Sequence, residues 1–264
     1  MVSVTDELSG TVALVTGANG GIGRATCAAM AAAGAIVYAS DIAAPVDIAG
    51  VEVAHCLVHD VTAEEDWQRV ASTIEHRHGR LDALVNNAGI AVTDSIVDTT
   101  LEVWRRVQAV NVESILLALR ACGPLLRLGG AARPGGASVV NLSSIAGLRG
   151  AAFHTAYCTS KGAVRLFTKA AAAEYGALGW PIRVNSVHPG SIDTPMMHAI
   201  IERHAELGGG VSEVEVQTSV ESRHLLGRLG RVDEIAAGVV FLCSHHASFM
   251  TGSEMVIDGG FSAI

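Results

Sequence analysis

The sequence predicts one α/β domain, a doubly wound parallel sheet of seven strands with helices on both faces. Three observations lead to this fold class. Short apolar, β-branched runs alternate with Ala-rich amphipathic stretches from one end of the chain to the other. The runs are continuously apolar, which is typical of parallel strands buried on both faces. No Pro-, Gly- or Ser-rich linker and no internal repeat divides the 264 residues, so we expect residues 1–264 to form a single domain.

Each predicted element follows from its local pattern. Apolar runs of four to six residues predict strands at Val12–Thr16, Ile36–Ser40, Val53–Val58, Ala83–Asn86, Ser138–Leu142, Arg183–His188 and Glu254–Ile257. Helical periodicity between them predicts helices at Ile22–Ala33, Glu64–His78, Leu101–Cys122, Tyr157–Leu178 and Val232–Cys243. Gly34 separates the first helix from the second strand, because glycine commonly ends a helix.

Two segments interrupt this alternation. Residues 129–136 read GGAARPGG and predict a flexible turn before the fifth strand. The segment Pro195–Gly230 carries a Gly-Gly-Gly run at 208–210 and has a loosely helical, irregular pattern. Ligands in open α/β sheets bind at the carboxyl ends of the strands, and this segment follows the sixth strand. We therefore expect residues 195–230 to form a lid over a substrate site.

Charge and composition exclude several classes of partner. The formal net charge is −8 and only 4% of the residues are aromatic, which argues against nucleic acid and against a polybasic membrane anchor. The first ten residues lack the basic and apolar regions of a secretory signal. Gly34 interrupts the uncharged stretch 25–40, and histidines and hydroxyls interrupt 235–253, so neither predicts a membrane span. We expect a cytoplasmic protein with a small-molecule substrate, no nucleic acid and no membrane partner.

The cysteines and histidines predict neither a disulfide framework nor a metal site. The five cysteines are odd in number, widely spaced and without a CxxC pair, which suits a reduced cytosolic protein. The eleven histidines have no carboxylate or thiolate partners at the spacing of metal ligands. We interpret them as ordinary surface or core residues.

A glycine-rich loop follows the first predicted strand directly. Residues 16–23 read TGANGGIG and a predicted helix comes next. Gly17 permits a tight turn, Gly21 lets the backbone approach a pyrophosphate, and Gly23 lets the helix pack closely on the sheet. The helix N-terminus adds free N–H groups and a partial positive charge. Although a glycine cluster alone also fits a simple turn, this strand–loop–helix context predicts a dinucleotide site.

The end of the second strand predicts which dinucleotide binds. Asp41 stands eighteen residues after Gly23, where an acid accepts hydrogen bonds from a ribose 2′-hydroxyl and repels a 2′-phosphate. No Lys or Arg stands in the glycine loop or at Ile42. The alternative role for Asp41 is the N-cap of the next segment. The sequence predicts NAD as the cofactor.

Tyr157 and Lys161 form the candidate catalytic pair. Their i, i+4 spacing puts phenol and ammonium on one face of a helix. A lysine cation stabilises a phenolate and would lower the tyrosine pKa from its usual value near 10. The pair would then serve as an acid/base for a hydroxyl or carbonyl oxygen, and its alternative is an ordinary surface pair.

With these motifs together, the chain resembles the short-chain dehydrogenase/reductase family over essentially its whole length. The glycine loop, the Asn-Asn-Ala-Gly run at 86–89 and the Pro-Gly pair at 189–190 match family motifs in order and spacing. The resemblance implies the Rossmann fold and a catalytic set of Asn111, Ser144, Tyr157 and Lys161. Ser144 lies thirteen residues before Tyr157, a spacing that favours it over its neighbour Ser143.

The resemblance also implies the cofactor contacts and the roles. The expected contacts are Gly17, Asn19, Gly20, Gly21, Ile22, Gly23, Asp41, Asp60, Val61, Asn87, Ala88, Gly89, Tyr157, Lys161, Pro189, Gly190, Ile192 and Thr194. Tyr157 would exchange a proton with the substrate oxygen, while Lys161 lowers its pKa and binds the nicotinamide ribose. Ser144 would donate a hydrogen bond to the same oxygen, and Asn111 would hold a water that relays protons.

The expected activity is the NAD(H)-dependent interconversion of a secondary alcohol and a ketone. The segment 187–197 is similar to that of bacterial hydroxysteroid and cyclic-alcohol dehydrogenases, and Met196 and Met197 suit either an adaptable apolar lining or simple packing. The main alternative is a 3-oxoacyl carrier-protein reductase, for which Arg105, Arg106, Arg120 and Arg127 could supply a basic patch. A non-catalytic nucleotide sensor and a hydro-lyase or epimerase are further alternatives. The family resemblance implies a homotetramer, to which the apolar stretches 115–122 and 167–173 could contribute.

Overall fold

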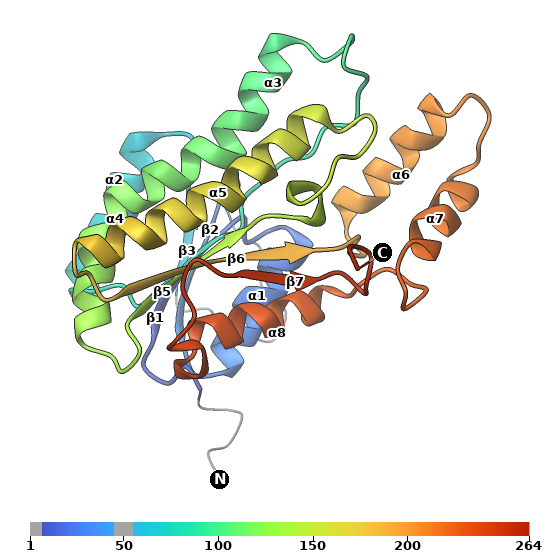
Figure 1. Cartoon of the computed structure of the whole chain (residues 1–264). Coiled ribbons are helices and arrows are strands. Elements are labelled where there is room, and N and C mark those ends of the chain that lie inside the picture. The colour runs from blue at the N-terminus through green and yellow to red at the C-terminus, as the bar shows by residue number, and fades with distance from the viewer. Residues whose placement is uncertain (1–6, 45–54, 264) are drawn as a thin grey trace.

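A computed structural model describes residues 7–44 and 55–263 and shows a seven-stranded sheet whose strands all run parallel (Figure 1). The strands are β1 (Val12–Thr16), β2 (Ile36–Asp41), β3 (His55–Val58), β4 (Ala83–Asn86), β5 (Ala137–Leu142), β6 (Ile182–Pro189) and β7 (Glu254–Ile257). Their order is β3-β2-β1-β4-β5-β6-β7. The chain therefore reverses direction across the sheet between β1 and β4, which is where open α/β sheets place their ligands.

Helices cover both faces of this sheet, as the sequence predicts. The long helices are α1 (Gly21–Ala32), α2 (Glu64–His78), α4 (Ser114–Ala131), α5 (Thr155–Ala177) and α8 (Val232–Cys243). Helices α1 and α8 pack on one face, and α2, α4 and α5 pack on the other (Figure 1). The five inner strands, β1, β2, β4, β5 and β6, contribute to both cores because their side chains alternate between the two faces. In β1, Ala13 and Val15 join the core under α1 and α8, whereas Val12 and Leu14 join the other.

The predicted strands and most predicted helices are confirmed to within about two residues at their ends. The exception among the strands is the third, because Val53 and Ala54 lie outside the described residues. The predicted end of the helix at Cys122 is wrong. Helix α3 (Leu101–Gln108) continues through a π-helical turn, η2 (Ala109–Glu113), into α4, which ends only at Ala131.

The flexible turn predicted for residues 129–136 is accordingly wrong in its first part. Gly129 and Gly130 lie inside α4 and are buried. A Cβ atom on Gly129 would overlap the carbonyl oxygen of Leu81, and one on Gly130 would overlap that of Pro181. These glycines allow the helix to approach the backbone of two neighbouring loops. Only residues after Ala131 form the turn into β5.

The irregular segment predicted for residues 195–230 contains two helices, α6 (Pro195–Leu207) and α7 (Glu213–Ser222). The Thr194 side chain caps α6 by accepting a hydrogen bond from the Met197 amide, and Pro195 occupies the first turn. Ser212 and Glu215 form a capping box at the start of α7. These local capping residues explain why a segment with weak hydrophobic periodicity is nevertheless helical.

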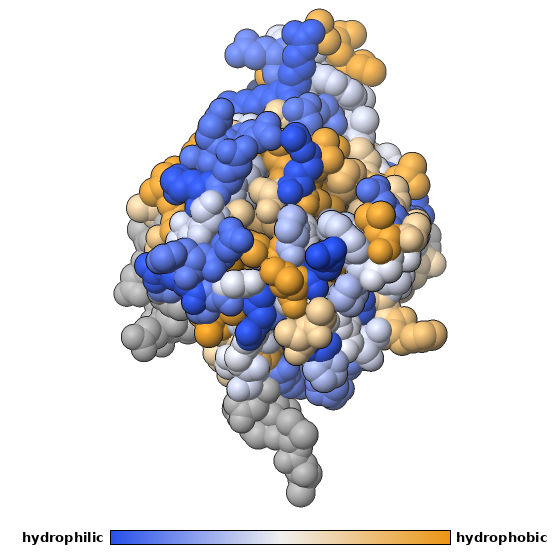
Figure 2. Space-filling view, turned by 90° about the vertical axis from the view of Figure 1, so that its left-hand side faces the viewer, coloured by the Kyte–Doolittle hydropathy of each residue, from blue (hydrophilic) through white to orange (hydrophobic). Residues whose placement is uncertain are grey.

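The continuous helical stretch Leu101–Ala131 is long and apolar enough to cross a membrane by length and composition alone, but 50% of its most apolar window is buried inside the protein. On the face shown in Figure 2, hydrophilic and hydrophobic side chains are interspersed. Among the residues that the structure describes, no group of three or more His, Cys, Asp or Glu side chains could hold a metal ion.

Candidate active site

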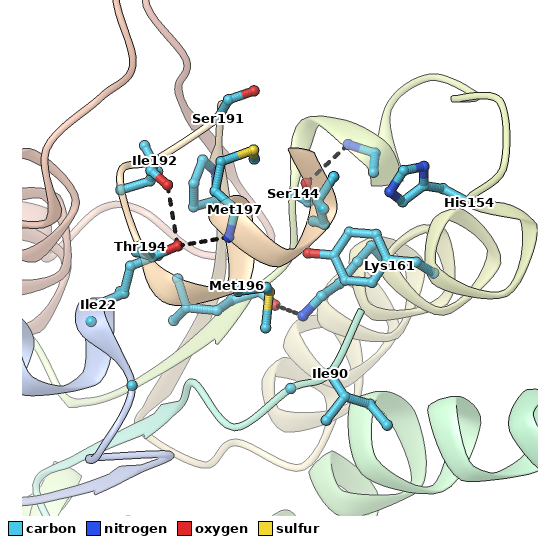
Figure 3. A pocket seen from close by; sticks show the side chains of 18 of the residues that line it. Ile22, Ile90, Ser144, His154, Lys161, Ser191, Ile192, Thr194, Met196 and Met197 are labelled. Atoms are coloured by element: carbon cyan, nitrogen blue, oxygen red, sulfur yellow. Dashed lines mark hydrogen bonds between the residues drawn. The ribbon is translucent and has the colours of Figure 1, made fainter. Parts of the chain in front are cut away.

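The carboxyl ends of the strands open into a cavity of about 920 Å³. Nearly all of the predicted site residues line it: Gly17, Asn19 to Gly23, Asp41, Asp60, Val61, Asn87 to Gly89, Ser144, Tyr157, Lys161, Pro189, Gly190, Ile192 and Thr194. Figure 3 shows Ile22, Ile192 and Thr194 on one side of this cavity and Ser144, His154 and Lys161 on the other. Of the predicted residues, only Asn111 lies outside the cavity wall.

The glycine loop has the shape that a phosphate cradle needs. Gly17 has a left-handed backbone with φ of 66°, and a Cβ atom there would lie 2.8 Å from the Ala88 Cα. A Cβ atom on Gly23 would overlap the Gly17 carbonyl oxygen. Any side chain at either position would therefore displace backbone. Helix α1 begins at Gly21, so its free N–H groups face the cavity at the loop.

Asp41 is tied to this loop at the end of β2. Its Oδ2 atom accepts a hydrogen bond from the Asn19 amide at 2.9 Å. At the end of β3, Asp60 Oδ1 accepts hydrogen bonds from the amide and the hydroxyl of Thr62. The cavity lining thus places both carboxylates at the same edge of the sheet, beyond the glycine loop. Together with the cradle, they fit an adenosine dinucleotide.

The Asn-Asn-Ala-Gly run braces the floor of the cavity. Asn86 donates to the side-chain oxygen of Asn141 on β5 at 2.8 Å, which links two neighbouring strands. Asn87 donates to the carbonyl oxygens of Thr16 and Gly17, at 2.9 and 3.0 Å. These bonds hold the glycine loop in register with β4.

Ser144 and Tyr157 lie next to each other in the cavity wall. Ser144 follows β5, and its hydroxyl accepts a hydrogen bond from the Ala146 amide at 3.1 Å. The neighbouring Ser143 instead donates its hydroxyl to the Lys161 carbonyl oxygen at 2.9 Å. The surrounding protein desolvates the Tyr157 phenol and raises its pKa to about 12, although a hydrogen bond with Ser144 acts in the opposite direction.

Lys161 lies beneath the tyrosine. Its ammonium donates to the Leu142 carbonyl oxygen at 2.7 Å and lies 5.7 Å from the centre of the Tyr157 ring. Burial lowers the pKa of Lys161 to about 8. The pKa of Tyr157 lies above its usual value and not below it, in contrast to the expectation from the sequence, because desolvation of the phenolate is the largest effect and exceeds the opposing effect of Ser144.

Asn111 lies behind the cavity wall in the π-helical turn. Its amide exchanges two hydrogen bonds with the Ile90 backbone and donates a third to the Ser160 hydroxyl at 2.9 Å. A Cβ atom on Gly89 would lie 3.4 Å from both Asn111 Oδ1 and Lys161 Nζ. Both groups therefore border Gly89, which leaves space for them, and in the described residues no direct hydrogen bond joins Asn111 to Lys161.

Helices α6 and α7 supply the outer wall, which sequence reasoning described only by Met196 and Met197. Ile200, Ile201, Val216 and Val220 add apolar side chains to it. Arg203 on α6 bridges to Asp94 at 2.8 Å and so ties the helix to the loop after β4. The His204 ring stacks on His154 with ring centres 5.1 Å apart.

His154 is a site residue that sequence reasoning missed. Its Nε2 and the Thr93 hydroxyl are 3.1 Å apart, and its Nδ1 lies 2.9 Å from the Ala152 carbonyl oxygen. The ring is buried and lines the cavity beside Tyr157. Its position three residues before the tyrosine was the only available signal, because its partners come from distant segments.

Comparison with known proteins places the chain in a family. The family model described as enoyl-(acyl carrier protein) reductase matches residues 17–262. The cyclopentanol dehydrogenase of Comamonas sp. (strain NCIMB 9872) is 42% identical over 259 residues, which cover 96% of this chain and 97% of that protein. The NADP-dependent (R)-specific alcohol dehydrogenase of Lentilactobacillus kefiri is 36% identical over 266 residues, covering 98% of this chain and all of that protein (100%).

The solved structures agree with these sequences. A short-chain type dehydrogenase/reductase from Mycobacterium marinum superimposes with a TM-score of 0.86 at 33% identity, covering 100% of this chain and 99% of that one. The predicted seven-stranded α/β fold is thereby confirmed. The chain belongs to the short-chain dehydrogenase/reductase family, a family of oxidoreductases that use a nicotinamide cofactor.

Proposed function

We propose that this protein is an NAD(H)-dependent oxidoreductase that interconverts an apolar, cyclic secondary alcohol and its ketone. One observation carries the proposal: the cavity that receives the glycine loop and Asp41 also brings Ser144, Tyr157 and Lys161 together. The similarity to a cyclopentanol dehydrogenase and the apolar wall from α6 and α7 support a cyclic substrate.

The chain's own residues would share the chemistry as follows. A bound nicotinamide supplies the acceptor or donor of the hydride. Tyr157 holds the proton that a ketone oxygen receives on reduction, and it takes the hydroxyl proton back on oxidation. Ser144 donates a hydrogen bond to the same oxygen as charge develops there. Lys161 stabilises the phenolate and binds the ribose, and Asn111 lies behind it on the route of a proton relay.

The choice of Ser144 over Ser143 rests on their different partners. The Ser143 hydroxyl donates its hydrogen bond to the Lys161 carbonyl oxygen. The Ser144 hydroxyl interacts with Tyr157. Ser144→Ala should therefore lose about 2–4 kcal/mol of transition-state stabilisation, the effect of one oxyanion donor. A larger loss of kcat in Ser143→Ala would overturn this assignment.

The choice of NAD rests on Asp41 and on the residues around it. Asp41 is held against the glycine loop by the Asn19 amide, and the sequence has no Lys or Arg between Arg24 and Arg69 to compensate a 2′-phosphate. The 36% identical alcohol dehydrogenase of Lentilactobacillus kefiri is NADP-dependent, so kcat/KM with NAD and with NADP tests this choice directly.

A carrier-protein reductase is the alternative function. Two of the four arginines proposed for a basic docking patch have partners, since Arg120 bridges to Glu64 at 3.0 Å and Arg127 stacks over Trp180. Arg106 lines the cavity. These contacts and the net charge of −8 favour a free small-molecule substrate over an acidic carrier.

We further propose a single domain with residues 195–230 as its lid, a cytoplasmic location and a homotetramer. Ile115 and Cys122, in the stretches considered for subunit contacts, are buried within one chain, whereas Leu116 and Leu166 are exposed on α4 and α5. Light scattering after size exclusion measures the subunit number directly, and a monomer would refute the tetramer.

A cofactor-coupled screen tests the function. Secondary alcohols with NAD and ketones with NADH are followed by the absorbance of reduced nicotinamide. We expect turnover of small cyclic alcohols, and loss of at least a thousandfold in kcat for Tyr157→Phe with cofactor affinity retained. Tyr157→Phe that keeps more than a tenth of the wild-type rate, or a wild type inactive on every alcohol and ketone, would refute the proposal.

A further inference from the structure

The cavity has an uneven distribution of charge. Among the described residues that line it, the only carboxylates are Asp41 and Asp60, at the ends of β2 and β3. The cations that line it are Lys161 of the catalytic set, Arg106 on α3, Arg149 in the loop that leads from β5 to α5, and Arg223 at the end of α7. Arg149 follows β5 and Arg223 comes after β6, which lie three and four strand positions from β2, or about 14 and 19 Å at roughly 4.8 Å per strand. The acids and these arginines therefore lie at opposite ends.

The two arginines come from segments that meet at the C-terminal tail. The Arg149 guanidinium lies 5.0 Å from the centre of the Phe261 ring and donates to the Phe261 carbonyl oxygen at 3.4 Å. Arg223 directly precedes His224, whose ring centre is 5.0 Å from that of Phe261. Phe261 itself lines the cavity. Arg149 is thus held at the mouth by an aromatic ring and a carbonyl group, not by an acid.

Neither Arg149 nor Arg223 forms an ion pair with a carboxylate in the described part of the chain. The positive charge of Arg223 acts on His204 in the cavity wall. The pKa of His204 is lowered mainly by burial, then by His154 and then by Arg223. This end of the cavity therefore combines an apolar wall with positive charge that no neighbouring acid in the described chain neutralises.

We propose that the substrate of the alcohol dehydrogenase reaction carries a carboxylate on an apolar ring, distant from the carbinol carbon, and that Arg149 and Arg223 bind it. This inference rests on the proposed function and narrows its substrate class. The ring packs against Met197, Ile200 and Val220 while its hydroxyl points to Tyr157. A guanidinium presents paired N–H donors that match the two oxygens of a carboxylate, so the group is bound and oriented together.

Binding of an unreactive probe tests the charge preference. With saturating cofactor, titration calorimetry should show that cyclohexanecarboxylate binds at least tenfold more tightly than the neutral, isosteric cyclohexanecarboxamide, or about 1.4 kcal/mol. The ratio should fall as salt is raised, because both arginines are exposed. Arg149→Gln and Arg223→Gln should each reduce the ratio at least threefold, and the double variant should bring it near one.

Arg120→Gln is the matched control, since it removes the same charge from α4 outside the cavity and should keep the wild-type ratio. Equal binding of the two probes to the wild type, or an unchanged ratio in the double variant, would overturn the inference. Oxidation of a hydroxycyclohexanecarboxylate and of its carboxamide separates the two proposals. Equal kcat/KM on both alcohols refutes the carboxylate site and keeps the dehydrogenase. Arginine-dependent carboxylate binding without turnover of any alcohol keeps the site and refutes the dehydrogenase.

Discussion

The carboxylate of Asp41 should decide between NAD and NADP. It accepts a hydrogen bond from Asn19 at 2.9 Å and therefore stands beside the loop that would receive the adenosine ribose. Two unit charges 4 Å apart repel by about 4 kcal/mol at an effective dielectric of 20, and a 2′-phosphate carries up to about two charges. Asp41 is partly exposed, so solvent screening reduces this repulsion. We expect about 2.8 kcal/mol of repulsion between the Asp41 carboxylate and a 2′-phosphate to remain, which corresponds to a roughly hundredfold preference for NAD over NADP in kcat/KM.

Asp41→Asn is the sharpest perturbation, because it removes the charge and keeps both the size and an oxygen for the Asn19 amide. Initial rates with one alcohol should show kcat/KM for NADP rising at least tenfold and that for NAD falling modestly. Asp41→Ser should shift the ratio in the same direction, and adding Ile42→Arg should improve NADP further, because Ile42 lines the cavity. Equal use of both cofactors by the wild type, or an unchanged ratio in Asp41→Asn, would refute the reasoning.

Three further outcomes are expected. Burial lowers the pKa of His59 from 6.5 to about 4, so the folded protein resists protonation of this ring. The free energy of unfolding should therefore fall by up to about 3 kcal/mol from pH 6.5 to pH 4. Chemical denaturation should show a shallower fall for His59→Gln, whereas the exposed control His76→Gln should keep the wild-type fall. Gly129→Ala should strongly lower the midpoint of thermal unfolding or prevent folding, because its Cβ atom would overlap backbone. Gly176→Ala on α5 has open space around it and should stabilise the protein by about 0.5–1 kcal/mol. Similar midpoints for the two variants would contradict the packing argument. If residues 195–230 act as a lid, cofactor together with an unreactive ring acid should slow their proteolysis compared with the free protein, and equal cleavage rates would speak for a static surface element.

The sequence alone was sufficient for the fold and for the position of the glycine loop between β1 and α1. Strand and helix periodicity predicted all seven strands because each apolar run is buried on both faces. The glycine loop could be interpreted at Gly17 because of the left-handed backbone of the turn, and at Gly23 because a Cβ atom there would overlap the Gly17 carbonyl oxygen; both constraints are local in the chain. The i, i+4 spacing of Tyr157 and Lys161 placed them on one helix face for the same local reason.

Tertiary structure decided what depends on contacts between distant segments. The high pKa of Tyr157 and the low pKa of Lys161 follow from burial, which spacing on a helix does not determine. Gly129 fits a turn by its local sequence, but in the folded chain it lies inside α4, where the backbone of a neighbouring loop packs against it.

The outer pocket shows the same division. Thr194 and Ser212 start helices in a segment that periodicity left irregular, because a cap acts through hydrogen bonds and not through an apolar pattern. Arg149 and Arg223 are 74 residues apart in the chain and lie at one end of one cavity because two loops and the C-terminal tail converge there. Burial and long-range proximity are properties of the folded chain, so no local reading of the residues could have supplied them.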